Sequence, residues 1–201
     1  NGAQFSPRLG IPSVHIVNAK AAGEAMAHLY SLGHRRIGIV TGPLVSPLSR
    51  DRLEGATAQA KKQGAERDFI AMNGDFSIES GAVAAARLLA RREPPTAIFC
   101  FNDEMAMGVY MTAQREGIRI PADLSVVGFD DIRYAACMNP PLTTVAQPMR
   151  EIGEGTVRLL MQILKDPEAR PEPVTLPHIL TVRSSTAPAT CSGVRAAGPG
   201  K

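Results

Sequence analysis

The sequence lacks several features that mark particular classes of protein. It has no Trp, and aromatic residues make up only 4% of its 201 residues. Its three cysteines (Cys100, Cys137 and Cys191) are far apart and form no CxxC pair or Cys/His cluster, which argues against a disulfide framework and a zinc site. No apolar run approaches the length of a membrane-spanning helix, and the first residues resemble no signal or transit peptide. We therefore expect a cytoplasmic protein with no membrane partner.

The chain also lacks a strong charge imbalance. Its formal net charge is +3, and the excess lies after Pro173, where Arg183, Arg195 and Lys201 occur without any acidic residue. Nucleic-acid footprints need a basic stripe or patch, and the rest of the chain shows none. We expect this segment not to bind DNA well by itself. Because the sequence begins at Asn1 and not at Met, we also expect it to be a piece of a longer chain.

Catalytic signatures are absent as well. The four histidines are scattered: His15, His28, His34 and His178. No GxSxG, GxxxxGK[ST] or GxGxxG motif occurs. Asp130 and Asp131 have the residue types for acid–base work, but neighbours on an extended chain point to opposite faces, which disfavours a dyad. Binding is favoured over catalysis, with no cofactor and no metal, and a nucleoside hydrolase-like activity of these two carboxylates is the weaker alternative.

What the sequence does contain is a regular alternation of strands and helices. Its central unit, Pro94 to Asp131, predicts a strand at Thr96–Phe101, a helix capped by Asn102 or Asp103, and a second strand at Leu124–Phe129. Strands joined by a crossover helix run parallel, so polar residues after both strands lie on one edge of the sheet. Ligands bind at this carboxyl edge in open α/β sheets.

About five such repeats predict an α/β fold with a doubly wound parallel sheet. Further strands are expected at 14–17, 37–41, 69–72, 142–146, 174–176 and 179–182, and further helices at 18–32, 49–63, from 77 through 89, and at 148–164. Asn18, Ser49 and Ser77 are the expected caps of the first three of these helices. The Ala-, Gly- and Pro-rich residues 187–201 are expected to be a disordered tail.

Four predicted strand tips converge on the carboxyl edge: Thr41-Gly42, Asp75-Phe76, Asn102-Asp103 and Asp130-Asp131. Each Asp or Asn either caps a helix or turn, or binds a ligand, and both interpretations stay open. No helical pattern follows Asp130, so this residue has no obvious helix to cap. Phe76 is either a lid over the core or a flat platform for a sugar or a base.

Arg52 is unusual because a helix beginning after Ser49 places this cation in the first turn, where the macrodipole is unfavourable by about 0.3–1 kcal/mol. It is either an exposed side chain paired with Asp51 or Glu54, or a guanidinium turned into the cleft. In the cleft it would bind ligand hydroxyls or pair with Asp130. We expect Arg52→Ala to leave folding nearly intact while weakening the response to a ligand.

A set of short motifs, in this order, resembles the LacI/GalR family of bacterial transcription regulators. The motifs are Gly33-His34-Arg35-Arg36-Ile37-Gly38, Gly42-Pro43, Arg52-Leu53-Glu54-Gly55, Gly74-Asp75-Phe76, Pro95 to Cys100, Asn102 to Ala106, Val126 to Asp131 and Pro140 to Thr144. The resemblance covers about Pro12 to Thr186. Within the family it is strongest to cytidine-responsive members and then to purine-responsive ones.

The resemblance implies a type I periplasmic-binding-protein-like effector domain, with two α/β lobes and a ligand cleft between them. Residues 18–142 would form the complete C-terminal lobe. Residues 1–17 would end a fragment of the N-terminal lobe, and residues 143–186 would return to that lobe and make the last crossover. The DNA-binding headpiece, the hinge helix and the first part of the N-terminal lobe would be missing.

The resemblance also implies where an effector would bind. Arg52 matches the arginine that binds ligand hydroxyls, Phe76 the aromatic packing partner, and Asn102 and Asp130 the polar pair at the strand tips. Asp103 is a weaker candidate. Two further weak candidates, Ser46 and Leu48, stand where purine-responsive members carry polar contacts, so the resemblance to purine binders does not extend to this loop.

The function that follows from the resemblance is an effector-sensing and dimerisation region of a bacterial repressor. A nucleoside or sugar would bind between the lobes of a homodimer and control operator DNA binding by a helix-turn-helix that this sequence does not contain. The alternative is a periplasmic sugar-binding protein of a transport system, which shares the fold but is exported.

Overall fold

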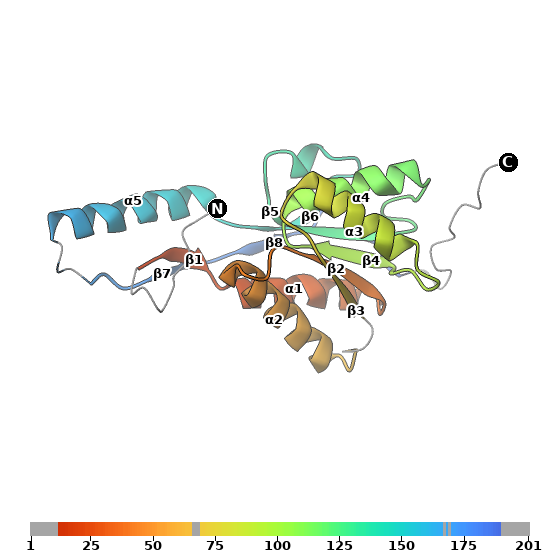
Figure 1. The fold of residues 1–201 in the computed structure, drawn as a ribbon, viewed down its shortest axis with the longest axis horizontal. Coiled ribbons are helices and arrows are strands. Elements are labelled where there is room, and N and C mark those ends of the chain that lie inside the picture. Colours follow the sequence, from red (N-terminus) through yellow and green to blue (C-terminus); the bar gives the residue numbers. More distant parts are fainter. Residues whose placement is uncertain (1–11, 66–68, 167, 169, 190–201) are drawn as a thin grey trace.

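The computed structural model describes residues 12–65, 69–166, 168 and 170–189. Figure 1 shows an elongated molecule with two units of unequal size. The larger unit is a sheet covered by helices on both faces. The smaller unit extends to one side and consists of a two-stranded sheet and one long helix. Residues at the start of the chain and residues far along it meet in the smaller unit.

The larger unit is built on a six-stranded sheet. Its strands are β2 (Ile37–Thr41), β3 (Phe69–Asn73), β4 (Ala97–Cys100), β5 (Ser125–Asp130), β6 (Thr143–Ala146) and β8 (Ile179–Thr181), in the order β3-β2-β4-β5-β6-β8. The first five strands pair in parallel, and β8 adds antiparallel to β6 at one edge. The predicted α/β class with a doubly wound parallel sheet is confirmed, and the antiparallel edge strand is an addition to it.

Helices cover both faces of this sheet, as expected for parallel strands buried on both sides. α1 (Asn18–Ser31) and α2 (Pro47–Lys62) pack together on one face, and α3 (Ile78–Leu89) and α4 (Asp103–Arg115) on the other (Figure 1). Phe99, Phe101 and Phe129 are the largest fully buried side chains of the core. Among the described helices, none has the length and apolar content needed to cross a membrane.

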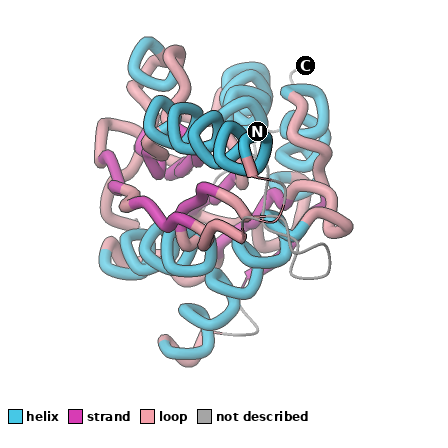
Figure 2. The backbone as a smooth tube through the Cα atoms, turned by 90° about the vertical axis from the view of Figure 1, so that its left-hand side faces the viewer, coloured by secondary structure: helices cyan, strands magenta, loops and turns pink. Residues whose placement is uncertain are grey.

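The smaller unit has a much smaller core. β1 (Val14–Ile16) pairs in parallel with β7 (Val174–Leu176), and α5 (Met149–Lys165) packs on both strands. A cluster of Val14, Ile152 and Leu159, with Leu176 beside it, holds the three elements together. Figure 2 views the molecule from this end. A short 3₁₀ helix at Ala135–Cys137 lies in the larger unit, between β5 and β6.

Two of the predicted helix caps are correct and two are wrong. Ser77 and Asn102 each accept a hydrogen bond from a backbone N–H in the first turn of the following helix. By contrast, α1 begins after Val17, and the carboxamide of Asn18 is engaged by Arg52 instead. α2 begins before Ser49, at Pro47, because proline has the backbone angle that the first helical position needs. Arg52 therefore lies in the second turn, and the predicted macrodipole penalty does not apply.

The boundary expected between residues 142 and 143 is displaced in the structure. Thr143 begins β6, which pairs with β5 in the six-stranded sheet, so the chain leaves this sheet only after Ala146. The six-stranded unit thus includes β6, which the sequence analysis assigned to the returning segment, and β8, which follows the last crossover. The sequence of a short strand says little about which strand it pairs with, because any strand with a free edge can supply its backbone hydrogen bonds.

The predicted disordered tail begins too early. The N–H of Ala187 donates to Ser125 Oγ (3.1 Å), its carbonyl oxygen lies 3.1 Å from His34 Nε2, and the N–H of Ala189 donates to the Leu32 carbonyl (2.8 Å). These bonds hold residues 187–189 against the larger unit. The rest of the predicted tail, 190–201, and residues 1–11 lie outside the described residues.

The two serines at helix starts allow a matched test of capping. Ser77→Ala removes the oxygen that accepts from the Ser80 N–H, and we expect it to lower the free energy of unfolding by about 1 kcal/mol. Ser46→Ala is the control, because Ser46 is the N-cap of α2 but makes no capping hydrogen bond through its side chain. Urea denaturation measures both. Equal losses for the two variants would contradict this account of the α3 cap.

Candidate functional site

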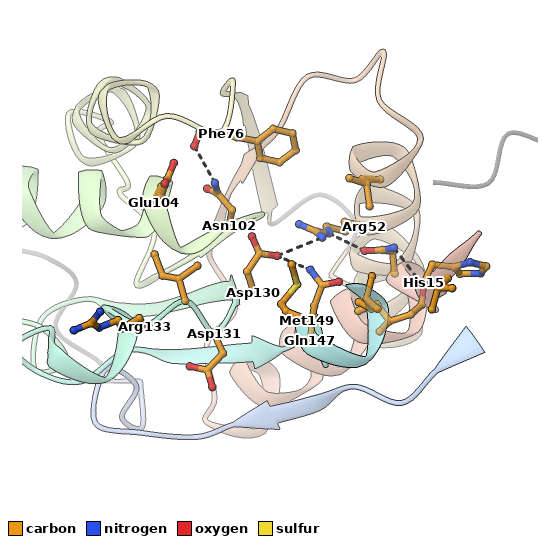
Figure 3. A pocket seen from close by; sticks show the side chains of 16 residues that line it. His15, Arg52, Phe76, Asn102, Glu104, Asp130, Asp131, Arg133, Gln147 and Met149 are labelled. Carbon is orange, nitrogen blue, oxygen red and sulfur yellow. Dashed lines mark hydrogen bonds and ion pairs between the residues drawn. The ribbon is translucent and has the colours of Figure 1, made fainter. Parts of the chain in front are cut away.

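A cavity of about 560 Å³ lies where the two units meet. Its walls come from β1, the first turns of α1 and α2, the loops after β3, β4 and β5, and the crossover from β6 into α5 (Figure 3). The larger unit contributes mainly polar side chains. The smaller unit contributes apolar ones, including Val14, Ile16 and Ile152. Such a cavity suits a ligand with one hydroxyl-rich part and one flat apolar part.

Four of the predicted strand-tip residues line this cavity. Phe76 comes from the loop after β3, Asn102 from the loop after β4, Asp130 from the end of β5, and Asp131 directly follows β5. The convergence of strand tips on one edge is therefore confirmed. Asp75, in contrast, does not line the cavity; its Oδ1 accepts from the N–H of Ser77 (2.9 Å), so the capping interpretation holds for it. Hydrogen bonds from the Ser77 hydroxyl and the Ser77 N–H hold the pKa of Asp75 below its usual range.

Asn102 serves both roles that the sequence left open. Its Oδ1 accepts from the Met105 N–H (2.9 Å), which caps α4, while its Nδ2 donates to the Phe76 carbonyl (2.9 Å). The side chain thus fixes the neighbouring loop while lining the cavity. Capping and ligand contact are not exclusive here, because a carboxamide has separate donor and acceptor ends.

Arg52 is buried, with only 3% of its side chain exposed, so the alternative of an exposed side chain paired with Asp51 or Glu54 is wrong. Its Nε donates to Asn18 Oδ1 (2.9 Å), and its Nη1 donates to the Phe101 carbonyl. The guanidinium lies 3.6 Å from the centroid of the Phe129 ring, a cation–π contact. Its Nη2 is 3.6 Å from Asp130 Oδ1. Figure 3 shows the guanidinium directed at this carboxylate.

From these contacts we expect Arg52→Ala to destabilise the fold, in contrast to the expectation from the sequence. Burial lowers the pKa of Arg52 to about 10, while Asp130 and Asp103 favour its charged form. The guanidinium is therefore charged at neutral pH and is held by groups from α1, β4 and β5. Its removal would leave the partly buried carboxylate of Asp130 without its cation, at a cost below the roughly 3–5 kcal/mol typical of fully buried pairs.

Asp130 faces the cavity from the end of β5, with 22% of its side chain exposed. Its Oδ1 accepts from Gln147 Nε2 (2.6 Å) and faces Arg52. Burial raises the pKa of Asp130, and Arg52 and Gln147 oppose that rise. The neighbouring Asp131 pairs with Arg183 instead (2.8 Å). The two carboxylates have different partners, in agreement with the prediction that they form no dyad.

Phe76 owes its position to a glycine. A Cβ at Gly42, after β2, would lie 2.1 Å from Cζ of the Phe76 ring, so only glycine leaves room for it. The half-buried ring lines the cavity and also packs against the core, so both interpretations of this residue hold in part. Its backbone has a φ of 72°. Asp130 and Asp131 also have positive φ, 110° and 51°, so backbone strain gathers at this cavity.

The structure contradicts the weaker assignment of Asp103 to the ligand site. Its side chain is 0% exposed and does not line the cavity. Its oxygens accept from Thr144 Oγ1 (2.6 Å) and from the N–H of Ile132 (2.8 Å), which ties α4 to β6 and to the loop after β5. Burial raises the pKa of Asp103 to about 7, against these two donors.

The loop candidates have different positions. Leu48 lines the cavity, whereas Ser46, the N-cap residue of α2, does not. Sequence reasoning missed Asn18, which was interpreted as a cap, and Gln147. The signal for Gln147 was available, since this residue follows a predicted strand just as Asn102 follows another. Among the described residues, no group of three or more His, Cys, Asp or Glu side chains is placed to hold a metal ion.

The titration of Asp103, which holds the loop after β5, predicts how the stability of the protein depends on pH. Its pKa is about 7 in the folded protein against an ordinary value of 3.8, so the folded state retains a proton that the unfolded state releases. Its contribution to stability therefore falls as pH rises from about 4 to 7, by up to about 1.4 kcal/mol per pH unit. Asp103→Asn cannot ionise, and we expect its free energy of unfolding to vary less over this range.

Denaturant unfolding at several pH values measures this difference. Asp123→Asn is the control, because Asp123 is a surface carboxylate in an ion pair with Arg119 that lowers its pKa to about 2. That variant should follow the native protein between pH 4 and 7. Parallel curves for the native protein and Asp103→Asn would show that Asp103 does not titrate there.

Comparison with known proteins places this geometry in a family. Residues 26–186 match the periplasmic binding protein-like domain. The chain is 44% identical over 160 residues to the HTH-type transcriptional repressor CytR of Escherichia coli K12, covering 79% of this chain and 47% of that protein. It is 38% identical over 178 residues to catabolite control protein A of Priestia megaterium, covering 88% and 54%. The chain thus spans about half the length of these curated relatives.

Solved structures agree with these sequence matches. A LacI family transcriptional regulator from Enterococcus faecium, with bound ribose, superposes with a TM-score of 0.85 at 30% identity, covering 93% of this chain and 69% of that one. A dimeric Lac repressor superposes with a TM-score of 0.82 at 33% identity, covering 92% and 67%. The chain belongs to the periplasmic binding protein-like domain family, as an effector-binding domain of the LacI/GalR type with similarity to CytR.

Proposed function

We propose that this chain is the effector-sensing and dimerisation region of a bacterial transcriptional repressor, and that its effector is an uncharged nucleoside or sugar bound in the cavity between the two units. The observation that carries the proposal is the facing pair of Arg52 Nη2 and Asp130 Oδ1, 3.6 Å apart, in the wall of a cavity that also holds the Phe76 ring. A fixed donor beside a fixed acceptor suits neighbouring hydroxyl groups.

The spare hydrogen-bonding capacity of this pair supports the assignment. Arg52 uses Nε and Nη1 on Asn18 and Phe101, so Nη2 remains for a ligand oxygen. Asp130 uses Oδ1 on Gln147, and among the described residues Oδ2 accepts no hydrogen bond. One hydroxyl would accept from Arg52 while its neighbour donates to Asp130. Bonds of this charge-assisted kind are shorter and stronger than neutral ones.

The charges of the cavity wall disfavour an anionic effector. Glu104, Asp130 and Asp131 line it. Of the two arginines that line it, Arg52 already faces a carboxylate and Arg133 is exposed to solvent. A phosphate group in this space would meet these carboxylates without a free buried cation to offset them. Phe76 provides a flat apolar surface for a sugar face or a base. We therefore expect nucleosides and free sugars to bind and their phosphorylated forms to bind poorly.

Regulation would follow from thermodynamic linkage between the effector site and the operator-binding site. If an effector changes the relative position of the two units, it changes operator affinity, and DNA changes effector affinity by the same factor. Such couplings are typically about 1–3 kcal/mol. Operator binding would belong to a segment that this sequence does not contain, in a cytoplasmic protein without catalytic activity. The relatives named as repressors, including CytR and PurR, support this role.

Dimerisation is proposed from the dimeric Lac repressor neighbour and from an apolar hollow on α4. Met107, Tyr110, Met111, Ile120 and Met138 line much of this hollow of about 470 Å³ on the larger unit. Met111 is 59% exposed. Met107 and Met138 are partly buried beside it. Apolar hollows lined by methionine suit protein partners, because the flexible thioether fits varied shapes.

Calorimetric titration of the full-length protein tests the effector class. We expect saturable heat with cytidine, adenosine or ribose, and little with ribose 5-phosphate. Asp130→Asn should weaken binding by about tenfold or more, because it removes a charged acceptor. Asp123→Asn, a distant surface carboxylate, should bind normally. Unchanged affinity in Asp130→Asn, or tighter binding of the phosphorylated sugar, would refute the proposed site.

Sedimentation of the same protein tests the dimer. Met111→Asp introduces a charge into the apolar hollow, and we expect it to shift the protein towards monomer. Val45→Asp is the control, because Val45 is 86% exposed and lies on the loop before α2, away from that hollow. If Met111→Asp stays dimeric at micromolar concentration, the dimer forms through another surface.

A further inference from the structure

Gln147 occupies the point where the chain leaves the larger unit for the smaller one. β6 ends at Ala146, and α5 begins at Met149, so Gln147 is the first residue of this crossover. Its side chain lines the cavity and donates from Nε2 to Asp130 Oδ1 at 2.6 Å (Figure 3). Its carbonyl accepts from the N–H of Met149 at 2.8 Å, which joins it to the first turn of α5.

This bond is the close contact that orients the Asp130 carboxylate. Arg52 Nη2 lies 3.6 Å from the same oxygen, beyond ordinary hydrogen-bond length, and Arg52 cannot move closer while Asn18 and Phe101 hold its other nitrogens. Asp130 itself has a positive φ of 110°, an unfavourable angle for a non-glycine residue. Its side-chain orientation therefore depends on a donor that belongs to the crossover.

We propose that Gln147 is a positioning residue that fixes the carboxylate of Asp130 for an effector and makes that orientation depend on the path of the crossover into α5. A displacement of α5 and the two-stranded sheet pulls on residues 147–149, lengthens the bond to Asp130 and turns the acceptor away. In the other direction, an effector that holds Asp130 also holds Gln147, and through it the start of α5. The proposal rests on the proposed function for the identity of the effector but not for the bond itself.

The alternative is that Gln147 only fills space beside the crossover. The two accounts differ in what they predict for Asp130. Around this carboxylate lie Arg52 from α2, Asp103 and Glu104 from α4, and Asp131, which directly follows β5. Burial raises the pKa of Asp130, while Arg52 and the hydrogen bond from Gln147 oppose the rise. A positioning donor therefore affects the titration of Asp130, whereas a space-filling side chain of the same length does not.

The first measurement follows Asp130 without any ligand. Gln147→Met keeps the length of the side chain and removes the donor, so the pKa of Asp130, read from its carboxyl ¹³C shift, should move to higher pH. Gln162→Met is the matched control, since Gln162 is exposed on α5. An unchanged titration of Asp130 in Gln147→Met would overturn the positioning role, whatever effector the protein binds.

The second measurement follows the crossover, again without ligand. The N–H of Ile152 donates to the Pro148 carbonyl at 2.9 Å and reports on the first turn of α5. Loss of the bond to Asp130 should free this turn, so the Ile152 amide should exchange hydrogen faster in Gln147→Met than in the native protein. Gln162→Met should exchange at the native rate. Equal exchange in all three proteins would overturn the link to α5.

The third measurement uses cytidine as the probe. Binding to Asp130 requires its ionised form, so affinity is present above its pKa and is lost as pH falls through it. Gln147→Met should weaken binding by about tenfold, with the loss beginning at higher pH than in the native protein. A native affinity and pH profile in this variant would also overturn the positioning role. No binding of cytidine by the native protein would count against the nucleoside assignment, and the two ligand-free measurements would still decide the role of Gln147.

Discussion

The buried guanidinium of Arg52 is the constraint on which the rest of the site depends. A charge taken out of water is costly unless it is paired and hydrogen-bonded, and Arg52 meets this demand with partners from three elements. Asn18 lies at the start of α1, the Phe101 carbonyl follows β4, and Phe129 and Asp130 belong to β5. One side chain thus sets the spacing between α1, α2 and two central strands at the edge where the cavity opens.

Backbone strain shows the same dependence on surrounding contacts. Among the described residues, Phe76, Asp130 and Asp131 are the non-glycine residues with positive φ, and all three line the cavity. Each such angle costs on the order of 1–3 kcal/mol and persists only where neighbours enforce it. Asn102 holds the Phe76 carbonyl, Gln147 holds the Asp130 side chain, and Arg183 holds Asp131. The strained backbone of the site is thus held by side chains that follow β4, β6 and β8.

The sequence predicted the order of strands and helices, the sheet edge at which polar tips meet, and the caps Ser77 and Asn102, because these depend on local patterns. It did not predict where long-range pairing assigns a short segment, so β6 was given to the segment that returns to the smaller unit. It also misjudged polar residues whose partners are distant in sequence. Asn18 binds Arg52 instead of capping α1, and Asp103 supports the loop after β5 instead of facing the cavity. Local sequence patterns identify residues that can cap a helix or bind a ligand. Which of these roles each residue has depends on the contacts made in the assembled sheet.

The two units differ in the size of their hydrophobic cores, and this difference affects how the site responds to a bound ligand. The larger unit places Arg52, Asn102 and Asp130 on a fully packed core. The smaller unit has a core of three buried residues, and α5 buries only Ile152 and Leu159 among its 17 residues. Local stability follows buried apolar contact, so displacement is easier in the smaller unit than in the larger one. A ligand bound between the two units therefore meets one fixed wall and one movable wall. Residues 147–149 join the two walls, so a displacement of the smaller unit acts on the site through them.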